Sequence, residues 1–234
     1  MAGQTTDHTR EAYDEMAGSY AELIRDTRYE AAVDLGMVTL FVQSLAQRPA
    51  TVLDAGCGTG RMITHLSTLD PELVIAGSDL SPGMLARARS QHPGLELVAA
   101  DNASLPFADE RFDGVLAWYS TIHTPPHRLG AIFEEFRRVV RPGGLVLLGF
   151  QAGTGDRRLD KPYGHDVDLV AYLHHTPYVR DALIHSGLAP VAVLDRSARG
   201  GGARRRGRGA LRPVPPPPQG RCSRLELRFS TVWK

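Results

Sequence analysis

A carboxylate and three glycines stand close together in residues 51–60, at the end of an apolar, strand-like run. Asp54 precedes Gly56, Gly58 and Gly60, and a helix-like segment follows at once. Glycines allow a sharp turn and leave no Cβ between the backbone and a ligand. The spacing differs from the G-x-G-x-x-G that binds the pyrophosphate of a dinucleotide. A carboxylate repels phosphate and attracts an ammonium group, which favours S-adenosylmethionine, although this motif alone leaves a nicotinamide dinucleotide open.

Two more acids and a tryptophan also follow apolar, strand-like runs: Asp79, Asp101 and Trp118. Asp79 lies 25 residues beyond Asp54, near the distance at which an acidic residue meets the ribose of a nucleotide cofactor. A carboxylate suits that task because it accepts two hydrogen bonds from a diol. Ligands of open parallel sheets bind beyond the carboxyl ends of the strands. We therefore expect these four side chains to converge on one edge of a sheet.

Strand-like and helix-like segments alternate between residues 49 and 195 and must position these side chains. Strands are expected at 51–55, 73–79, 95–100, 113–117, 145–150 and 190–195, helices at 61–69, 83–91, 129–140 and 176–187, and a stop-and-turn at 141–144. The strands are nearly all apolar, as parallel strands covered on both faces are. The order predicts an α/β fold with a doubly wound, mostly parallel, Rossmann-like sheet.

Two segments beside these elements could cover the site. Residues 1–48 predict an N-terminal helical cap, since apolar side chains recur at helical spacing within 11–46. Its helices could simply pack on the core; alternatively, Tyr13 and Tyr20 cover the cofactor. Residues 151–175 lack clear periodicity, which is typical of a binding lid. We expect a cofactor-binding core at 49–195 with this acceptor-site insertion.

The composition is that of an ordinary soluble globular protein, with 42% hydrophobic and 23% charged residues in a chain of 234. No apolar run approaches the roughly 20 residues of a membrane helix. The N-terminus lacks the apolar stretch of a secretory signal, and two cysteines make no disulfide framework. We therefore expect a cytoplasmic protein without membrane contact.

The charge is unevenly distributed along the chain. Residues 196–234 carry ten Arg, one Lys and one Glu, whereas residues 1–195 carry 16 basic and 25 acidic side chains. The acidic body argues against a broad nucleic-acid surface. Residues 196–224 are rich in Gly, Arg, Ala and Pro, cannot bury a core and predict disorder. Residues 225–234 alternate as a terminal strand would.

The basic tail has two interpretations. It could bind nucleic acid or an acidic partner, or it could replace the original end of the protein after a reading-frame change in GC-rich coding DNA. The composition switches abruptly just before an expected strand, which favours the second interpretation.

The chain resembles the class I S-adenosylmethionine-dependent methyltransferases, especially those that act on small molecules. The matching segments, within about residues 11–195, are VLDAGCGTG, GSDLSPGMLARA, ADNASLPF, FDGVLA and FRRVVRPGGLVLL. The resemblance implies a last strand that runs antiparallel between two others, which residues 225–233 could supply. It also implies S-adenosylmethionine as the cofactor.

The resemblance further implies a role for each matching residue. Asp54, Gly56 and Gly58 would hold the methionine end, and Cys57 and Gly60 of the same motif would also bind the cofactor. The adenosine would lie at Asp79, Leu80, Met84, Asp101, Asn102 and Ala103. Trp118 would line the transfer site, and Tyr20 would close over the cofactor. Asp79 would bind the ribose hydroxyls, and Asp101 would accept a hydrogen bond from the adenine amino group.

The acceptor is expected beside the segment that follows the fourth strand. His123 is the best candidate for a general base; alternatively, it anchors a proline turn without catalysing anything. Tyr119 and, from the insertion, His165 are further catalytic candidates. Histidines of the insertion could suggest a metal, but no Cys or carboxylate spacing supports one, so none is expected.

Two absences narrow the acceptor. The fourth strand does not end in the Asn/Asp-Pro-Pro-Tyr of enzymes that methylate amide or base nitrogens, and no target-recognition domain fits in the chain. We expect in-line methyl transfer to a small-molecule O, N or C nucleophile, by a monomer or homodimer, with nucleic acid as an unlikely partner. The alternatives are an RNA or other macromolecule methyltransferase that docks through the tail, and a non-catalytic cofactor-binding subunit.

Overall fold

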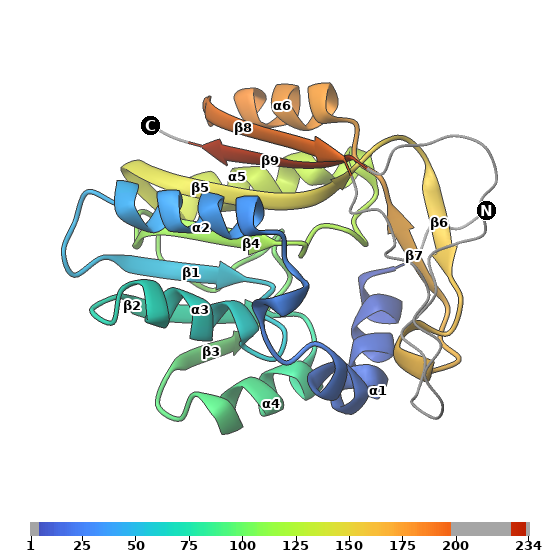
Figure 1. Ribbon diagram of the computed structural model, residues 1–234. Helices are drawn as coiled ribbons and strands as arrows, with labels where there is room; N and C mark the ends of the chain where they lie inside the picture. The colour runs from blue at the N-terminus through green and yellow to red at the C-terminus, as the bar shows by residue number, and fades with distance from the viewer. Residues whose placement is uncertain (1–4, 198–225, 233–234) are drawn as a thin grey trace.

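The computed structural model describes residues 5–197 and 226–232. The strands of its central sheet are β1 (Thr51–Ala55), β2 (Val74–Asp79), β3 (Glu96–Ala99), β4 (Phe112–Trp118), β5 (Val140–Ala152), β8 (Pro190–Ser197) and β9 (Glu226–Val232). They lie in the order β3-β2-β1-β4-β5-β9-β8 (Figure 1). Strands β1 to β5 pair in parallel, and β9 is antiparallel to both of its neighbours. The predicted mostly parallel, doubly wound sheet is confirmed.

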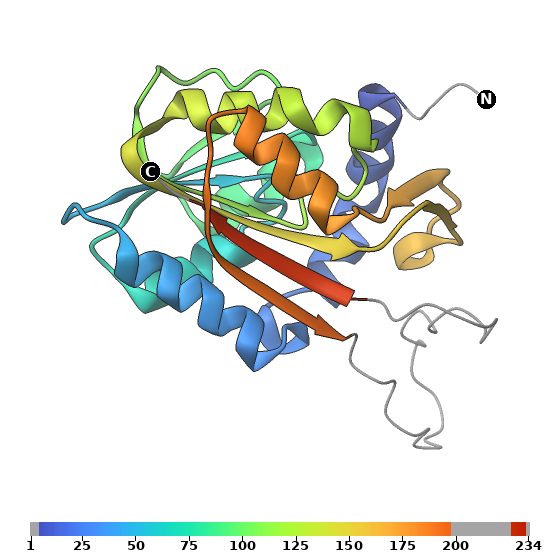
Figure 2. The same cartoon turned by 90° about the horizontal axis from the view of Figure 1, so that it is seen from above.

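Helices cover both faces of this sheet (Figure 2). They are α1 (Thr6–Leu23), α2 (Ala32–Ser44), α3 (Arg61–Leu69), α4 (Pro82–Gln91), α5 (Leu129–Val139) and α6 (Thr176–His185), with short 3-10 helices η1 (Thr27–Tyr29), η2 (Pro126–Arg128) and η3 (Pro162–Gly164). Val52 and Leu116 pack under α2, α3 and α4, whereas Leu53 and Val115 pack under α5 and α6. Alternate side chains enter opposite layers, which explains why the strands are apolar throughout.

Strand β5 differs from its prediction. It begins at Val140 and includes residues 141–144, where the sequence predicts a turn. Val140 pairs with Phe112 and Leu145 pairs with Gly114, so the intervening residues bulge out of the ladder. The turn-forming residues therefore produce a β-bulge within the strand and do not end it.

The C-terminal part of the sheet also differs from the sequence-based prediction. β8 continues to Ser197, and its Arg196, assigned above to the tail, forms an ion pair with the buried Asp34 of α2. Residues 226–232 form β9 between β5 and β8, which is the inserted antiparallel position that the resemblance implies. The disorder predicted for residues 196–224 is wrong for Arg196 and Ser197, which belong to β8; the rest of that range lies outside the described part. The two interpretations of the tail remain predictions.

The insertion at 151–175 folds into a small hairpin beyond the carboxyl ends of the strands (Figure 1). Its strands, β6 (Asp156–Leu159) and β7 (Leu169–Tyr172), pair with each other in an antiparallel sheet. Leu169 is buried together with Met16 and Ala12 of α1. The hairpin and α1 therefore form one cover over that edge of the sheet.

Helix α1 is anchored to the N-terminus of α4. The Asp14 Oδ1 atom accepts hydrogen bonds from Ser81 Oγ at 2.6 Å and from the backbone N–H of Gly83 at 2.8 Å. A Cβ at Gly83 would lie 3.2 Å from the Asp14 Cα, so the glycine permits the close approach of the two helices. These contacts fix α1 over the end of β2.

We predict that Asp14→Ala loosens α1 without unfolding the sheet. Hydrogen bonds to a charged group contribute about 1.5–3 kcal/mol each, so amide hydrogen exchange within α1 should accelerate on the order of tenfold or more. Glu11→Ala, an exposed position on the same helix, is the matched control and should leave exchange nearly unchanged. Equal exchange in both variants would contradict this anchoring role.

Candidate functional site

A cavity of about 480 Å³ lies beyond the carboxyl ends of β1, β2 and β4, under α1 and η3. It is lined by many of the residues that the sequence predicts: Tyr20, Gly56, Gly58, Asp79, Leu80, Met84, Asp101, Asn102, Ala103, Trp118, Tyr119 and His123. A hollow of about 30 Å³ shares five lining residues with it and adds Asp54 and Cys57. The structure therefore brings nearly all of the predicted site residues together at one sheet edge.

The glycine loop is held tightly between β2 and the segment after β4. The Gly56 and Cys57 N–H groups both donate to the Ser78 carbonyl, at 2.7 and 2.8 Å. Gly56 has a φ of +79°, and a Cβ on it would lie 2.2 Å from the Ser120 Cβ. At Gly58, also at positive φ, an added Cβ would meet nothing within 4 Å. The loop is closed on one side and leaves space at Gly58, where it faces the cavity.

Asp54 is a buried carboxylate with an unsatisfied oxygen. The residue is 1% exposed, and its Oδ2 atom has no hydrogen-bond partner. Burial raises its pKa to about 7, aided by the nearby Asp79 and opposed by Arg61. Unpaired buried polar atoms are costly, and an ammonium group would satisfy this one. The site thus fits the methionine end of S-adenosylmethionine, which carries such a group.

A buried ion pair that the sequence analysis missed closes the same end. Arg61 Nη1 lies 2.5 Å from Glu30 Oε1, which also accepts a hydrogen bond from Trp118 Nε1 at 3.1 Å. The arginine and glutamate side chains are 11% and 9% exposed. Arg61 directly follows Gly60 and could have been noticed for that reason. No local pattern marks Glu30, since only the fold brings residues 30, 61 and 118 together.

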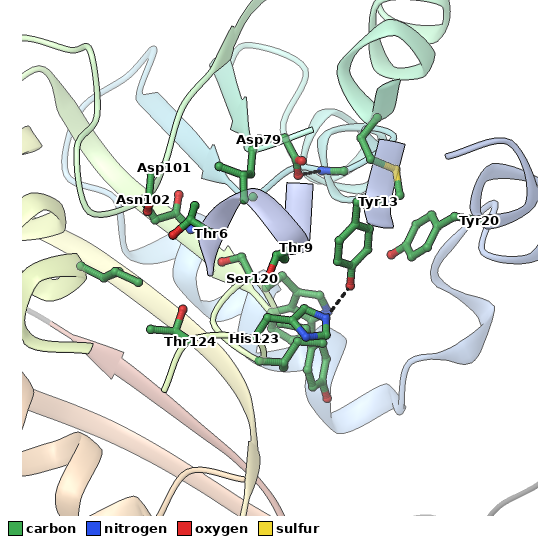
Figure 3. A pocket seen from close by; sticks show the side chains of 18 of the residues that line it. Thr6, Thr9, Tyr13, Tyr20, Asp79, Asp101, Asn102, Ser120, His123 and Thr124 are labelled. Atoms are coloured by element: carbon green, nitrogen blue, oxygen red, sulfur yellow. Dashed lines mark hydrogen bonds between the residues drawn. The ribbon is translucent and has the colours of Figure 1, made fainter. Parts of the chain in front are cut away.

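Asp79 organises the loop and faces the cavity at the tip of β2. Its Oδ2 accepts the Gly58 N–H at 2.8 Å (Figure 3), and its Oδ1 accepts the Ser81 N–H at 2.9 Å. Burial raises its pKa, although these backbone hydrogen bonds oppose the shift. Each carboxylate oxygen can accept a second hydrogen bond, so Asp79 remains able to bind a diol.

Asp101 stands at the end of β3 beside the first turn of α1. Its Oδ1 accepts the Ala103 N–H at 2.9 Å, and its Oδ2 lies 3.9 Å from Arg128 Nη2. Arg128 in turn donates to Thr6 Oγ1 at 3.1 Å. Figure 3 shows Thr6 beside Asp101 and Asn102. The turn after β3 therefore presents polar groups to the side of the cavity where the resemblance places adenine.

Tyr13 and His123 meet on another side of the cavity (Figure 3). The Tyr13 hydroxyl lies 2.9 Å from His123 Nε2, and His123 Nδ1 lies 2.6 Å from the Val170 carbonyl oxygen of β7. A carbonyl only accepts, so Nδ1 carries the proton. Nε2 of the neutral ring then accepts from Tyr13. Burial lowers the pKa of His123, which favours this neutral form.

The other two catalytic candidates are placed differently. Tyr119 lines the cavity at a φ of +58°, with its ring against that of Trp118. Burial raises its pKa, so the phenolate needed for a base is disfavoured. His165 does not line the cavity; it bonds Ser19 Oγ and Glu15 Oε1 at 2.8 and 3.2 Å. The hairpin turns it toward the side of α1 instead.

Two predicted cofactor residues support the loop and contribute little lining. Gly60 lies at a φ of +88° where α3 begins, and a Cβ on it would lie 2.7 Å from the His92 ring. It is absent from the lining of both hollows. Cys57 is buried, and burial raises the pKa of its thiol. Its side chain packs in the core cluster beneath the loop, and the residue also lines the smaller hollow.

Within residues 5–197 and 226–232, no group of three or more His, Cys, Asp or Glu side chains could hold a metal ion. No helix in those residues is both long and apolar enough to cross a membrane.

Comparison with known proteins identifies the domain. Residues 52–144 match the family described as methyltransferase domain. Malonyl-[acyl-carrier protein] O-methyltransferase of Pseudescherichia vulneris is 45% identical over 100 residues, which are 43% of this chain and 38% of that protein. Demethylmenaquinone methyltransferase of Beutenbergia cavernae is 34% identical over 142 residues, or 57% of each chain. This chain therefore spans about two to three fifths of the length of such relatives.

Solved structures share this fold. Magnesium protoporphyrin IX methyltransferase from Synechocystis, with bound S-adenosylmethionine, superimposes with a TM-score of 0.69 at 17% identity, covering 100% of this chain and 98% of the other. The 1,6-didemethyltoxoflavin-N1-methyltransferase of Burkholderia thailandensis gives a TM-score of 0.64 at 20% identity, covering 100% of this chain and 92% of the other. The architecture is therefore the Rossmann-like methyltransferase fold.

The fold gathers the carboxylates of Asp54, Asp79 and Asp101 at the carboxyl ends of its parallel strands. Residues 52–144 form a methyltransferase domain, and the fold is the Rossmann-like methyltransferase fold. The predicted fold class is thereby confirmed, and the matched domain agrees with the predicted family and cofactor. The predicted roles of single residues, cytoplasmic location and oligomeric state remain predictions.

We predict that Gly56→Ala abolishes cofactor binding. The new methyl group would overlap the Ser120 Cβ, and overpacking of this kind costs about 1–3 kcal/mol in addition to the strain of positive φ. Gly94→Ala is the matched control, because Gly94 has a φ of +90° and open space around its Cβ. Calorimetric titration with S-adenosylhomocysteine should show lost binding in the first variant alone. Similar losses of binding in both variants would mean that backbone strain at positive φ, and not overlap with Ser120, causes the effect.

Proposed function

We propose that this protein transfers a methyl group from S-adenosylmethionine to a small-molecule acceptor. The observation that carries the proposal is the unsatisfied oxygen of Asp54, in a hollow that shares lining residues with the cavity lined by Asp79, Asp101 and His123. Relatives whose names include trans-aconitate and demethylmenaquinone as substrates support a small acceptor.

The chain offers a partner for each polar part of the cofactor. Asp54 would accept hydrogen bonds from the methionine ammonium group, and the Arg61 guanidinium would balance its carboxylate. Asp79 would bind the ribose hydroxyls. Asp101 would accept from the adenine amino group, with Met84 packed beside the ring. These assignments follow from the charge, burial and position of each side chain.

For methyl transfer, the main task of the protein is to align the acceptor with the methyl group. S-adenosylmethionine supplies a methyl group already activated by a sulfonium. The chain must hold the acceptor atom in line with that carbon, about 3 Å away, and exclude water. Helix α1 and the β6–β7 hairpin cover the cavity and are suited to both tasks. A base near the acceptor completes the site when the acceptor must lose a proton.

Asp54→Asn should weaken S-adenosylmethionine binding by about 10- to 100-fold. The variant keeps the shape of the side chain and removes its charge, and a hydrogen bond to a charged group is worth about 1.5–3 kcal/mol. Asp168→Asn, which removes an exposed acid in an ion pair with Arg158, is the control and should bind as the wild type does. Isothermal titration calorimetry measures both.

Unchanged affinity in Asp54→Asn would overturn the assigned binding mode. A second measurement separates an enzyme from a non-catalytic binding subunit. Wild-type protein incubated with S-adenosylmethionine and a panel of small acceptors should release S-adenosylhomocysteine. Binding without release on any acceptor would favour the subunit.

Cofactor binding should release a proton near pH 6. The Asp54 pKa is about 7 in the folded protein, so its carboxyl is mostly protonated below that pH. A bound ammonium group stabilises the ionised form and lowers the pKa. Affinity should therefore fall as the pH drops from 8 to 6. Calorimetry in buffers of different ionisation enthalpy measures the number of protons released on binding. The Asp54→Asn variant should release none.

A further inference from the structure

We infer that Tyr13 and His123 form a proton relay that deprotonates the acceptor, and that the acceptor is a phenol- or enol-like hydroxyl compound. The inference rests on the proposed methyl transfer and adds to it a residue from α1. The sequence analysis assigned Tyr13 only to covering the cofactor.

The geometry fixes the direction of the relay. The Val170 carbonyl holds the proton of His123 on Nδ1, which leaves the Nε2 lone pair pointing at the Tyr13 hydroxyl 2.9 Å away. Tyr13 therefore donates to His123 and keeps oxygen lone pairs for an incoming donor. Both residues line the cavity (Figure 3). An acceptor O–H that reaches Tyr13 can thus pass its proton on.

The surroundings keep both groups neutral before the reaction. Arg157 of β6 lies near His123 and, with burial, lowers its pKa, whereas the hydrogen bond to Val170 raises it. Burial, Tyr163, Tyr20 and Asp79 raise the pKa of Tyr13. A lone tyrosinate is therefore disfavoured as the base, and the histidine ring is the group able to take up the proton.

The transfer balances as follows. The acceptor oxygen forms a bond to the methyl carbon while its proton moves to Tyr13 Oη. The original Tyr13 proton moves to His123 Nε2, and the carbon–sulfur bond breaks with its electron pair going to sulfur. The products are the methyl ether, S-adenosylhomocysteine and an imidazolium, which returns its proton to solvent when the site opens.

The lining favours an aromatic or otherwise planar acceptor over a carboxylate. The Tyr20 ring packs edge to face against Tyr13 and against Tyr163. The ring centroids lie 6.3 Å apart in the first pair and 4.9 Å apart in the second. The arginines of the described lining, Arg61, Arg128 and Arg196, each already contact a carboxylate. A carboxylate acceptor is also ionised at neutral pH and would have no use for a base.

The test uses para-substituted phenols that differ in acidity but little in size, from 4-methoxyphenol to 4-nitrophenol. S-adenosylhomocysteine release is followed from pH 5 to 10 in the wild type, Tyr13→Phe and His123→Asn. In the wild type, the rate should level off above the histidine pKa and depend weakly on phenol acidity. Either variant should be slower by about 10²–10⁴-fold with 4-methoxyphenol.

The variants should recover activity with 4-nitrophenol at high pH, because that phenol ionises without help. A merely structural role would lower all rates alike and leave the pH profile unchanged. Tyr178→Phe and His185→Asn, exposed positions of α6, are matched controls and should match the wild type. Calorimetry should give both relay variants an S-adenosylmethionine affinity within about threefold of the wild type.

Three results would overturn the inference. One is a wild type that binds S-adenosylmethionine yet methylates none of the phenols. Another is a wild-type pH profile retained in both relay variants. The third is equal losses with all phenols at every pH. A wild type that fails to bind S-adenosylmethionine would instead overturn the proposed function itself.

Discussion

The arrangement of the site depends on burying carboxylates at the strand tips, where the nearby Arg61 offsets the cost of burial only in part. Asp54 is almost fully buried and has an oxygen that no protein group satisfies. Asp79 stands at the neighbouring strand tip, and its charge adds to the effect of burial on the Asp54 pKa. Such a pair is unfavourable in the empty protein. A cationic ligand would relieve this unfavourable interaction.

The parallel sheet brings these carboxylates together, and α1 and the β6–β7 hairpin cover them. Parallel strands direct their carboxyl ends to one edge, where Asp54, Asp79 and Asp101 gather. Helix α1 closes that edge and is tied down through Asp14 to the first turn of α4. The β6–β7 hairpin packs on α1 and supplies the Val170 carbonyl that fixes the His123 ring. Different segments around one cavity would thus build the proposed cofactor and acceptor ends of the site.

The tight glycine loop shows why the motif needs its residues. Gly56 must lack a side chain because β4 and its following segment approach within contact of it, whereas Gly58 faces open space. Gly60 begins α3 against the His92 ring. The glycines of this one motif therefore have different structural roles. The pattern could be recognised from sequence, but these roles become visible only once β4 and α4 are in place.

Much of the site could be predicted because the relevant signals are local. An apolar run, a following acid and a helix start are contiguous in sequence, and the order of such units fixes a doubly wound sheet. Strand tips, and hence Asp54, Asp79 and Asp101, follow from that topology. Contacts made across the fold left no such signal: the Arg61–Glu30 pair, the Asp14 anchor and the Tyr13–His123 hydrogen bond each join segments distant in sequence.

The sequence by itself thus determined the fold class and predicted the cofactor and the sheet edge at which it would bind. Tertiary structure alone decided which side chains the insertion and α1 present to the acceptor. It placed His165 beside Ser19 and Glu15, and it paired His123 with Tyr13. The physical reason is that strand and helix periodicity is a property of neighbouring residues, whereas the packing of a cover on a sheet depends on surfaces that the chain assembles only when folded.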